Sequence, residues 1–510
     1  MISPPGDPVL RCDAAREFEA RLFGGDESRE WPAMQRAGRG VADAVLRDCE
    51  EIGGFPARGK ILVLAGKGHN GGDALIAAQA ILERFPAATA DVVFAFGERA
   101  LRPLAVRAWR DLAQASGARV RVCAQPDDTG TGYALSLDGV FGFQFRAPVS
   151  PAVAALFAQV DALPIGLRAA VDLPSGLTDE TKHDDVVLRA DFTYATGCVK
   201  AACVNGVYAR WLGRLRYVDL GFFKQEKVHS RLRVLTPAVL APLARLRAPE
   251  SDKRTYGHLF VIGGSRSFPG AVLMAVQAAL RSGAGLVTAF VPESLAAAYA
   301  AGTPEAMWVG WPETPEGGLA LEGHHLLRER LERADALLIG PGLSREAETL
   351  ALVSDIVKSS TLPLVLDADA LQPDIVRAGT APRILTPHIG EFRRVLKGDD
   401  FHNQSPSRDS VVVLKGRLTA ITFAGEGYYS PFGGPVLARG GSGDLLAGMV
   451  GAQLAQAPQD PLGAAALATV WHGLAADALA RAHGQVAVRT TQVLDFLPTA
   501  LRESGAWPPT

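Results

Sequence analysis

Residues 60–84, KILVLAGKGHNGGDALIAAQAILER, join a short apolar run to an alanine-rich stretch through a glycine loop. The run 60–64 predicts a buried strand, and the stretch 74–84 predicts a helix. The loop between them fits the pattern G-x-G-x-x-G, whose glycines let a phosphate approach the backbone at a helix N-terminus. A strand, a glycine loop and a helix in this order predict the first unit of a parallel α/β sheet.

The same alternation continues on both sides of this unit. Helical segments over residues 13–49 precede it, and the segments that follow are predicted as strands at 91–96, 119–123, 135–140 and 168–172 and a helix at 103–115. This βαβ rhythm predicts an N-terminal α/β domain with a Rossmann-like, doubly wound sheet over residues 1–228. A polar, basic stretch at 222–233, followed by prolines 237, 242 and 249, predicts a domain boundary.

A second α/β series begins after this boundary. The predicted strands are 258–262, 286–290, 336–339, 364–367, 383–385 and 411–415, and the predicted closing helices are 444–454 and 462–480. We expect a second domain with α/β/α layers over residues 235–505. Its motifs differ from those of the first half, which indicates a fusion and not an internal duplication. In both sheets, the loops at the carboxyl ends of the strands are the expected ligand sites.

Composition limits the class of protein. The 510 residues carry a formal net charge of −2 and are 48% hydrophobic, which favours large cores and does not indicate a nucleic-acid or anionic-membrane partner. The five cysteines form no C-x-x-C pair, so a disulfide scaffold or structural zinc site is not expected. The apolar stretch 270–291 is interrupted by Gln277, Arg281 and Ser282. We therefore expect a soluble, cytoplasmic protein without a membrane span, and a homo-oligomer is left open.

The glycine loop of the first half has three interpretations. It could be a hydride-transfer dinucleotide site, with Glu98 near the end of the next strand as the ribose contact. It could equally be a tight turn capped by Asp73. The third interpretation is contact with a ligand. It is favoured over the other two because three polar side chains, His69, Asn70 and Asp73, lie in one turn.

Two further loops of the first half carry oxygen-bearing side chains. One is DGVFG at 138–142, and the other is VDLPSGL at 171–177. Asn70, Asp138 and Ser175 would give hard oxygen ligands, which suit a monovalent or group 2 cation better than zinc. Asp172 would then be free as a general acid or base, although capping of loop amides is an alternative role for it.

The second half contains RGGSGDLLAG at 439–448. Its glycines expose N–H groups to an anion at a helix N-terminus, and Asp444 falls in the first turn, where it could deprotonate a hydroxyl beside a transferred phosphoryl group. An N-capped helix without catalytic function is the alternative.

Other polar loops of this half follow predicted strands. Residues 415–419 could bracket nucleotide phosphates, Asp367 and Asp369 could bind metal or loop amides, and His388 could be a ligand contact or a buried structural histidine.

The motifs of the first half resemble the NAD(P)H-hydrate epimerase domain, whose pattern is N-N-G-G-D, D-x-x-x-G and V-D-x-P-S-G. The resemblance covers residues 1 to about 225. It implies that a hydrated nicotinamide nucleotide contacts His69, Asn70, Gly71, Gly72, Asp73 and Asp172, with Gly142 and Arg146 in a phosphate-side loop over 142–148. It also implies that potassium is held by Asn70, Asp138 and Ser175. The chain departs from the pattern at His69, which replaces an asparagine, and at Phe143-Gln144.

The second half, over about residues 235–495, resembles ADP-dependent NAD(P)H-hydrate dehydratase of the ribokinase-like superfamily. The motifs are GGS at 263–265, GAGLV at 283–287, GPG at 340–342 and LTPH at 385–388. The resemblance implies that Ala284, Gly342, His388 and Asp444 contact the hydrate. It implies that ADP or ATP, with Mg²⁺, is bound by Lys415, Gly416, Arg417, Leu418, Thr419, Gly441, Ser442 and Gly443. The stretch PFGGP at 431–435 and Arg439 depart from the pattern.

Together, the two resemblances imply repair of NADH and NADPH whose ring has gained water. The first domain would interconvert the R and S hydrates with Asp172 as acid or base. The second would dehydrate the S form in a nucleotide-dependent reaction with Asp444 as base. The alternative is a ribokinase-like small-molecule kinase with a non-catalytic, nucleotide-binding N-terminal domain.

Overall fold

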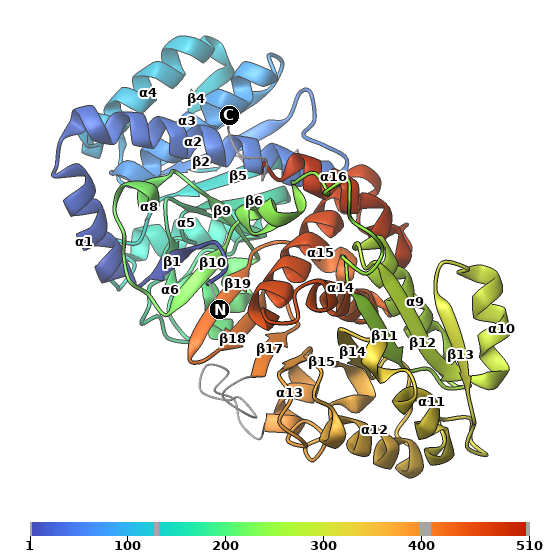
Figure 1. Cartoon of the computed structure of the whole chain (residues 1–510). Helices are drawn as coiled ribbons and strands as arrows, with labels where there is room; N and C mark the ends of the chain where they lie inside the picture. Colours follow the sequence, from blue (N-terminus) through green and yellow to red (C-terminus); the bar gives the residue numbers. More distant parts are fainter. Residues whose placement is uncertain (1–2, 127–131, 397–409, 506–510) are drawn as a thin grey trace. The chain divides into compact units, whose positions relative to one another are not determined.

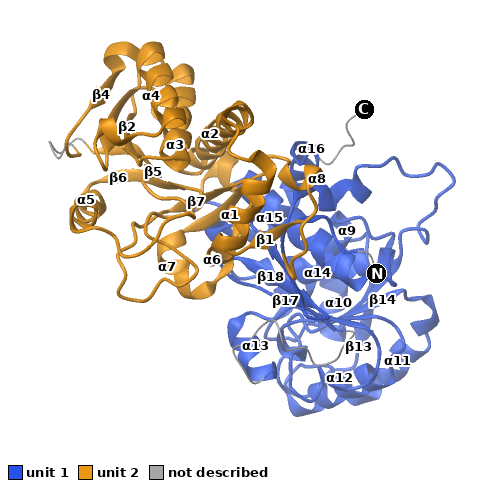
Figure 2. Ribbon diagram, turned by 90° about the vertical axis from the view of Figure 1, so that its left-hand side faces the viewer, with its two compact units in different colours: residues 1–6, 233–479, 486–510 blue, residues 7–232, 480–485 orange. Residues whose placement is uncertain are grey.

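The computed structural model describes residues 3–126, 132–396 and 410–505. The chain divides into two compact units, coloured separately in Figure 2. Unit 2 comprises residues 7–232 and 480–485, and unit 1 comprises residues 1–6, 233–479 and 486–510. The main break, between residues 232 and 233, falls between the two predicted ranges 1–228 and 235–505.

Unit 2 is built on a seven-stranded sheet in which every neighbouring pair is parallel. The strand order is β4 (Val120–Val122), β3 (Thr89–Phe94), β2 (Lys60–Ala65), β5 (Tyr133–Gly139), β6 (Ile165–Val171), β7 (Phe192–Thr196) and β9 (Arg214–Val218). The order reverses between β2 and β5, which makes their carboxyl ends the expected ligand crevice of a doubly wound sheet. The Rossmann-like prediction for this half is confirmed.

The helices of unit 2 cover both faces of this sheet because alternate residues of β2 point to opposite sides. Ile61 and Val63 belong to one core cluster with α2 and α3, whereas Leu62 and Leu64 pack with α5. Sequence reasoning did not predict the small ladder of β1 (Gly6–Leu10) with β8 (Val199–Lys200), which pairs Leu10 with Lys200. The helices are α1 (Cys12–Phe23), α2 (Glu27–Cys49), α3 (His69–Arg84), α4 (Pro103–Ser116), α5 (Pro151–Ala162), α6 (Ala201–Val204), α7 (Ala209–Leu212) and α8 (Phe222–Gln225).

Unit 1 is built on a second, mixed sheet (Figure 1). Its strands run in the order β13 (Met307–Trp311), β12 (Leu286–Pro292), β11 (His258–Ile262), β14 (Ala336–Ile339), β15 (Leu364–Leu366), β16 (Arg383–Leu385), β17 (Ser410–Leu414), β18 (Thr419–Phe423) and β19 (Glu426–Ser430). Pairs from β13 to β17 are parallel, and β18 pairs antiparallel with both β17 and β19. β10 (Leu232–Leu235) spans the break between the units.

Helices also cover both faces of this second sheet. α9 (Pro269–Arg281) and α14 (Ser442–Gln456) pack closely because Gly448 leaves room for the Ala275 backbone, while α12 and α13 pack in the opposite layer on Phe260 and Ile262. The other helices are α10 (Glu293–Gly302), α11 (His324–Arg328), α12 (Ala347–Ser359), α13 (Ile389–Leu396), α15 (Pro461–His483) and α16 (Leu497–Glu503). The α/β/α prediction is confirmed.

One helix of the described residues, α15, is long and apolar enough to cross a membrane by length and composition. Its apolar window is 89% buried inside the protein, which is typical of a core helix.

Candidate active sites

Three loops of unit 2 meet at the switch point of its sheet. They follow β2, β5 and β6, and the glycine loop after β2 leads into α3, which begins at His69. The loops after β2 and β5 touch at the backbone level, because a Cβ on Gly66 would lie 2.0 Å from the Val140 oxygen and one on Gly139 would lie 2.5 Å from the Asn70 oxygen. The Asn70 side-chain amide donates to the Phe141 carbonyl at 2.8 Å. These close approaches explain the glycines of the motif without a hydride-transfer site.

Asp138, Ser175 and Phe141 form a buried oxygen cluster at the ends of β5 and β6. The Ser175 hydroxyl donates to Asp138 Oδ1 at 2.6 Å, the Ser175 amide donates to Asp138 Oδ2 at 2.8 Å, and the Phe141 amide donates to Ser175 Oγ at 2.8 Å. Burial raises the pKa of Asp138 to about 6, against the lowering effect of these hydrogen bonds. The groups that hydrogen-bond to this carboxylate are neutral.

This cluster fits a cation held by oxygen. Asp138 supplies a buried carboxylate, Ser175 a hydroxyl, and the Phe141 carbonyl and the Asn70 side chain lie beside them. Among the described residues, no group of three or more His, Cys, Asp or Glu side chains is arranged to hold a metal ion. A cation at this cluster would therefore depend on neutral oxygens besides Asp138, a donor set that suits a hard ion.

Asp172 pairs with a lysine that sequence reasoning missed. Asp172 follows β6 with φ 67°, a left-handed conformation that is uncommon for a residue other than glycine, and its carboxylate accepts from Lys200 Nζ. The Lys200 side chain is fully buried, and its ammonium also donates to the Cys198 carbonyl at 3.0 Å. Burial alone would lower the pKa of Lys200, but Asp172, with Cys198 and Glu19, raises it above its usual range.

The available sequence signal for Lys200 was a lone lysine in the apolar run TYATGCVKAACV at 193–204. Phe143, one of the departures from the epimerase pattern, places its ring centroid 4.7 Å from the same ammonium. The replacement therefore adds an aromatic face beside the buried ion pair.

A cavity of about 580 Å³ opens above these loops. Of the residues predicted to bind the hydrate, those that line it are His69, Asn70, Asp73, Gly142, Arg146 and Asp172, while Gly71 and Gly72 are not part of its lining. Lining residues that sequence reasoning missed are Glu19, Lys67 and Arg102. Glu98, the ribose contact of the dinucleotide alternative, instead accepts from Trp109 at 2.9 Å and does not line the cavity.

In unit 1, the glycine loop opens α14 next to a lysine. Gly441 caps the helix with φ 90°, and Asp444 lies in the first turn. A Cβ on Gly443 would lie 3.0 Å from Lys415 Nζ, so the ammonium is beside the loop. Lys415 also donates to buried Asp367 at 2.8 Å, and Asp367 accepts from the Thr386 hydroxyl at 2.7 Å.

The environment of Asp444 favours proton exchange near neutrality. Burial, then the negative charge of Asp367, raises the pKa of Asp444 to about 7, and Lys415 opposes this rise. A carboxylate with such a pKa is suited to accept a proton from a substrate hydroxyl.

A cavity of about 550 Å³ adjoins Asp444. It brings Asp444 together with Gly342, as expected, and with Ala271, Phe268 and Arg345, which were not predicted. Asp369 at its edge accepts from the Ser344 amide and from the Arg345 guanidinium, at 3.2 and 3.0 Å. These contacts favour the interpretation of Asp369 as a loop-amide acceptor.

His388 lies beside the site and does not line the cavity. Its Nδ1 accepts from the amides of Gly390 and Glu391 at 3.0 and 3.3 Å, and its side chain is 60% exposed. It forms a backbone bridge with Lys415, the first of the predicted nucleotide contacts. Residues 415–418 connect β17 to β18, which begins at Thr419, and residues 441–443 lie at the start of α14. The two predicted nucleotide segments are close together, because Lys415 Nζ lies beside Gly443.

Ala284 is not brought together with the other predicted residues. It precedes β12, and a Cβ on its neighbour Gly283 would lie 3.8 Å from the side chain of Gln456, the last residue of α14. Asp444 is twelve residues earlier on that helix, or about 18 Å away at 1.5 Å per residue. Ala271, at the start of α9, occupies the cavity instead.

Comparisons with known proteins match each half separately and the whole chain. Residues 32–202 match the family of the YjeF-related protein N-terminus, and residues 259–499 match the NAD(P)H-hydrate dehydratase family. A bifunctional NAD(P)H-hydrate repair enzyme from Gloeobacter violaceus is 36% identical over 95% of this chain and 96% of that protein. A second, from Moorella thermoacetica, is 34% identical over 92% of each.

Two solved structures are similar to about half of the chain. A ribokinase-like superfamily protein from Enterococcus faecalis is 30% identical, with a TM-score of 0.48, over 55% of this chain and 99% of that one. An ADP/ATP-dependent NAD(P)H-hydrate dehydratase from Bacillus subtilis, co-crystallised with ATP and Mg²⁺, is also 30% identical, with a TM-score of 0.44, over 51% of this chain and 94% of that one.

Proposed function

Because this chain belongs to the family of bifunctional NAD(P)H-hydrate repair enzymes, we propose residue roles for an epimerase and a dehydratase reaction. The epimerase domain spans residues 1–228 and the dehydratase domain spans residues 235–505 in this proposal. The first interconverts the R and S hydrates of NADH and NADPH. The second consumes the S hydrate with ADP or ATP and returns the reduced nucleotide.

The epimerase proposal rests on the buried pair of Asp172 and Lys200 at the main cavity of unit 2. A carboxylate positioned by a buried ammonium at the edge of a cavity can accept a proton from a bound substrate. Asp172 is therefore the base of the reaction. Asp73 and Asn70 contact the hydrated ring, and Gly142 and Arg146 lie on the loop that receives the phosphates.

The oxygen cluster of unit 2 is the proposed potassium site. Asn70, Asp138 and Ser175 would hold the ion, and the Phe141 carbonyl supplies a further oxygen next to them. A bound potassium ion supplies positive charge to Asp138. With Asp138 neutralised, the loop of residues 141–148 would keep its position over the cavity.

The dehydratase proposal rests on Asp444, which follows the glycine loop and lines the cavity of unit 1. Asp444 takes the proton of the hydrate's hydroxyl as that oxygen receives a phosphoryl group. The amides of Gly441 to Gly443 and the Lys415 ammonium bind the transferred phosphate. Elimination of phosphate, with loss of a proton from C5, then restores the ring.

Mg²⁺ would bind to this half through the phosphates of the nucleotide, because Mg²⁺ is usually held by substrate phosphates and not by a site made only of protein ligands. When bound, it neutralises phosphate charge. Residues 415–419 complete the proposed nucleotide contacts, and His388, which forms a backbone bridge with Lys415, is a proposed contact of the hydrate.

The dehydratase assignment is tested with purified S hydrate of NADH, ATP and Mg²⁺. We expect reduced-nicotinamide absorbance to return together with an equal amount of phosphate, and we expect neither product with Asp444→Asn. A stable phosphorylated product without recovery of NADH would instead establish a kinase of the ribokinase type.

A further inference from the structure

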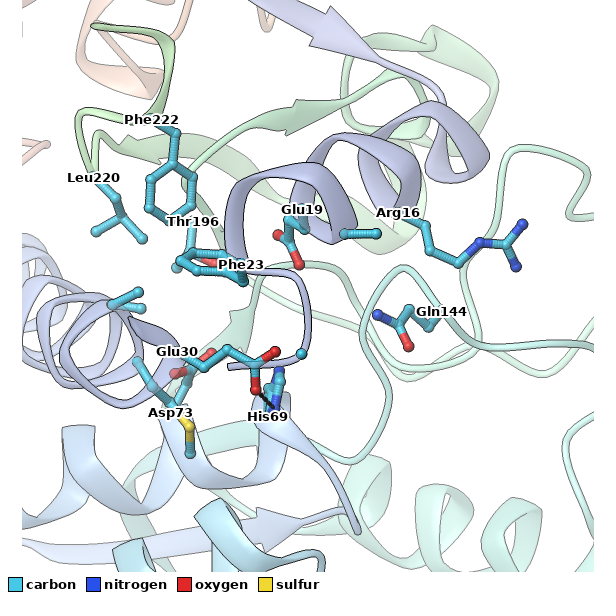
Figure 3. A pocket seen from close by; sticks show the side chains of 15 residues that line it. Arg16, Glu19, Phe23, Glu30, His69, Asp73, Gln144, Thr196, Leu220 and Phe222 are labelled. Carbon is cyan, nitrogen blue, oxygen red and sulfur yellow. Dashed lines mark ion pairs between the residues drawn. The ribbon is translucent and has the colours of Figure 1, made fainter. Parts of the chain in front are cut away.

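Unit 2 contains a second cavity, of about 300 Å³, whose lining is drawn in Figure 3. It shares part of this lining with the main cavity. Its remaining lining is mostly apolar, from α1, α2 and residues 220–222. The residues common to both cavities are Glu19, His69, Asp73, Gln144 and Thr196. Asp172 lines the main cavity only. Two carboxyl groups, Glu19 and Asp73, therefore lie at the junction of the two chambers.

Glu19 comes from α1, outside residues 32–202 that match the family of the N-terminal half. Asp73 is 8% exposed, and its Oδ1 has no hydrogen-bond partner among the described residues. A buried carboxyl oxygen without a partner, aimed at a cavity, points to a ligand that completes its hydrogen bonding.

The charges that act on Glu19 come from four other elements. They are Lys200 of β8, Asp172 after β6, Glu30 of α2 and Asp73 of α3, and Glu30 is itself paired with His69 at 3.4 Å. Burial raises the pKa of Glu19 to about 7, with Asp172 and Glu30 adding to the rise and Lys200 opposing it. Burial, then Asp172 and Glu19, raises the pKa of Asp73 well above its usual range. Near neutral pH, Glu19 can therefore both hold and give up a proton.

Inversion at C6 of the hydrate requires an acid and a base together. The C6–O bond breaks when the leaving hydroxyl gains a proton, and the lone pair of the ring nitrogen forms a C=N bond. Water then adds to the other face of C6 and loses a proton, so the product differs from the substrate only in configuration. Asp172, in contact with Lys200, is the proposed acceptor of the second proton, so a separate group is needed to supply the first.

We propose that Glu19 is a second acid–base catalytic residue of the epimerase, which gives its proton to the C6 hydroxyl while Asp172 accepts the proton of the incoming water. The proposal rests on the proposed epimerase function of unit 2. In the reverse direction, Asp172 gives the proton and Glu19 accepts it. Asp73, whose Oδ1 has no partner among the described residues, forms a hydrogen bond with the substrate beside Glu19.

The test uses the full chain and purified R hydrate of NADH with potassium, ATP and Mg²⁺, so that recovery of NADH reports epimerisation. We expect Glu19→Gln to lower kcat by about 100-fold or more, with KM within about threefold. In the unsubstituted protein, kcat falls as pH rises through about 7, because the acid loses its proton, and this dependence disappears in Glu19→Gln. Glu17→Gln, on the exposed side of α1, is the matched control and should retain full activity.

The role of Glu19 and the epimerase function of unit 2 would fail in different ways. Failure of the unsubstituted protein to convert the R hydrate would overturn the epimerase function itself. An active protein in which Glu19→Gln keeps kcat within about threefold would overturn only the role of Glu19. Turnover of the S hydrate serves as the control for unit 1.

Two additional measurements keep the proposal testable if Glu19→Gln does not fold. Glu19→Asp keeps a carboxyl group, and we expect it to retain both epimerisation and its fall above neutral pH; loss of that pH dependence would contradict the role. In water labelled with ¹⁸O and without nucleotide, the inverted hydrate should carry solvent oxygen at C6. An inverted product that keeps its original oxygen would exclude the proposed bond cleavage.

Discussion

Asp172 and Asp444, the two proposed bases, each lie near a lysine, but their surroundings give them different properties. Asp172 contacts the ammonium of fully buried Lys200 directly. Within the described residues, Asp444 has no such direct contact with an ammonium. Lys415 donates to Asp367 and, from its position beside Gly443, lowers the pKa of Asp444. The first arrangement positions a carboxylate through a direct contact with an ammonium, and in the second, burial and Asp367 raise the pKa of Asp444 to about 7.

The pH dependence of dehydration should reflect the titration of Asp444. With the pKa of Asp444 raised to about 7, kcat/KM for the S hydrate is expected to fall as pH drops below about 7, because the protonated group cannot act as base. Lys415 lowers this pKa, so Lys415→Met should move the acid limb to higher pH besides reducing the rate. A pH–rate profile whose acid limb stays in place in Lys415→Met would contradict this role.

Removal of Lys200 should affect both activity and stability. Lys200→Met leaves the Asp172 carboxylate buried without its partner, which typically costs about 3–5 kcal/mol, and we expect epimerisation to fall by about 100-fold. Chemical denaturation and turnover of the R hydrate measure the two effects. The exposed Lys182→Met is the control. A variant of Lys200 that matches this control in both measurements would exclude the proposed pairing.

At the scale of elements, the glycine loop before α14 is the part of the proposed dehydratase site at which an added side chain is expected to disturb a nucleotide contact. In Gly443→Ala, the new methyl group would lie 3.0 Å from Lys415 Nζ, so the lysine must move from the phosphate position. We expect KM for the nucleotide to rise about tenfold or more, with epimerisation unchanged.

Gly302→Ala, at the end of α10, is the control for this loop, because nothing lies within 4 Å of its added Cβ. Nucleotide saturation curves for the two variants provide the measurement. Equal KM values would show that the loop tolerates a side chain and does not hold phosphate as proposed.

The elements themselves could largely be predicted from the sequence, since local patterns determine them. Apolar runs followed by glycines identify the strand and glycine loop at 60–73 and the loop at 439–444 in the sequence. Lys200 and Glu19 could not be identified in this way, because they reach the site from β8 and α1, and only tertiary packing brings them there. Ala284 was placed at the site by its motif alone, and the motif lies at the amino end of β12.

At the scale of the whole molecule, each unit carries its own sheet, its own cavity and the carboxylates proposed to act there. The two activities should therefore respond to different ions. Replacing potassium by lithium should slow turnover of the R hydrate, because the larger ion would be held by Asn70, Asp138 and Ser175, but should leave turnover of the S hydrate unchanged. Asp138→Asn should have the same selective effect. Equal slowing of both reactions would contradict the assignment of potassium to unit 2.

The most direct test of the two-reaction account uses a mixture of R and S NADH hydrates with ATP, Mg²⁺ and potassium. Recovery of reduced-nicotinamide absorbance is followed for the intact chain, Asp172→Ala and Asp444→Ala, with spontaneous epimerisation subtracted. We predict full recovery for the intact chain, prompt recovery of only the S fraction for Asp172→Ala, and none for Asp444→Ala. An intact chain that stops at the S fraction, or that returns no NADH, would contradict the account.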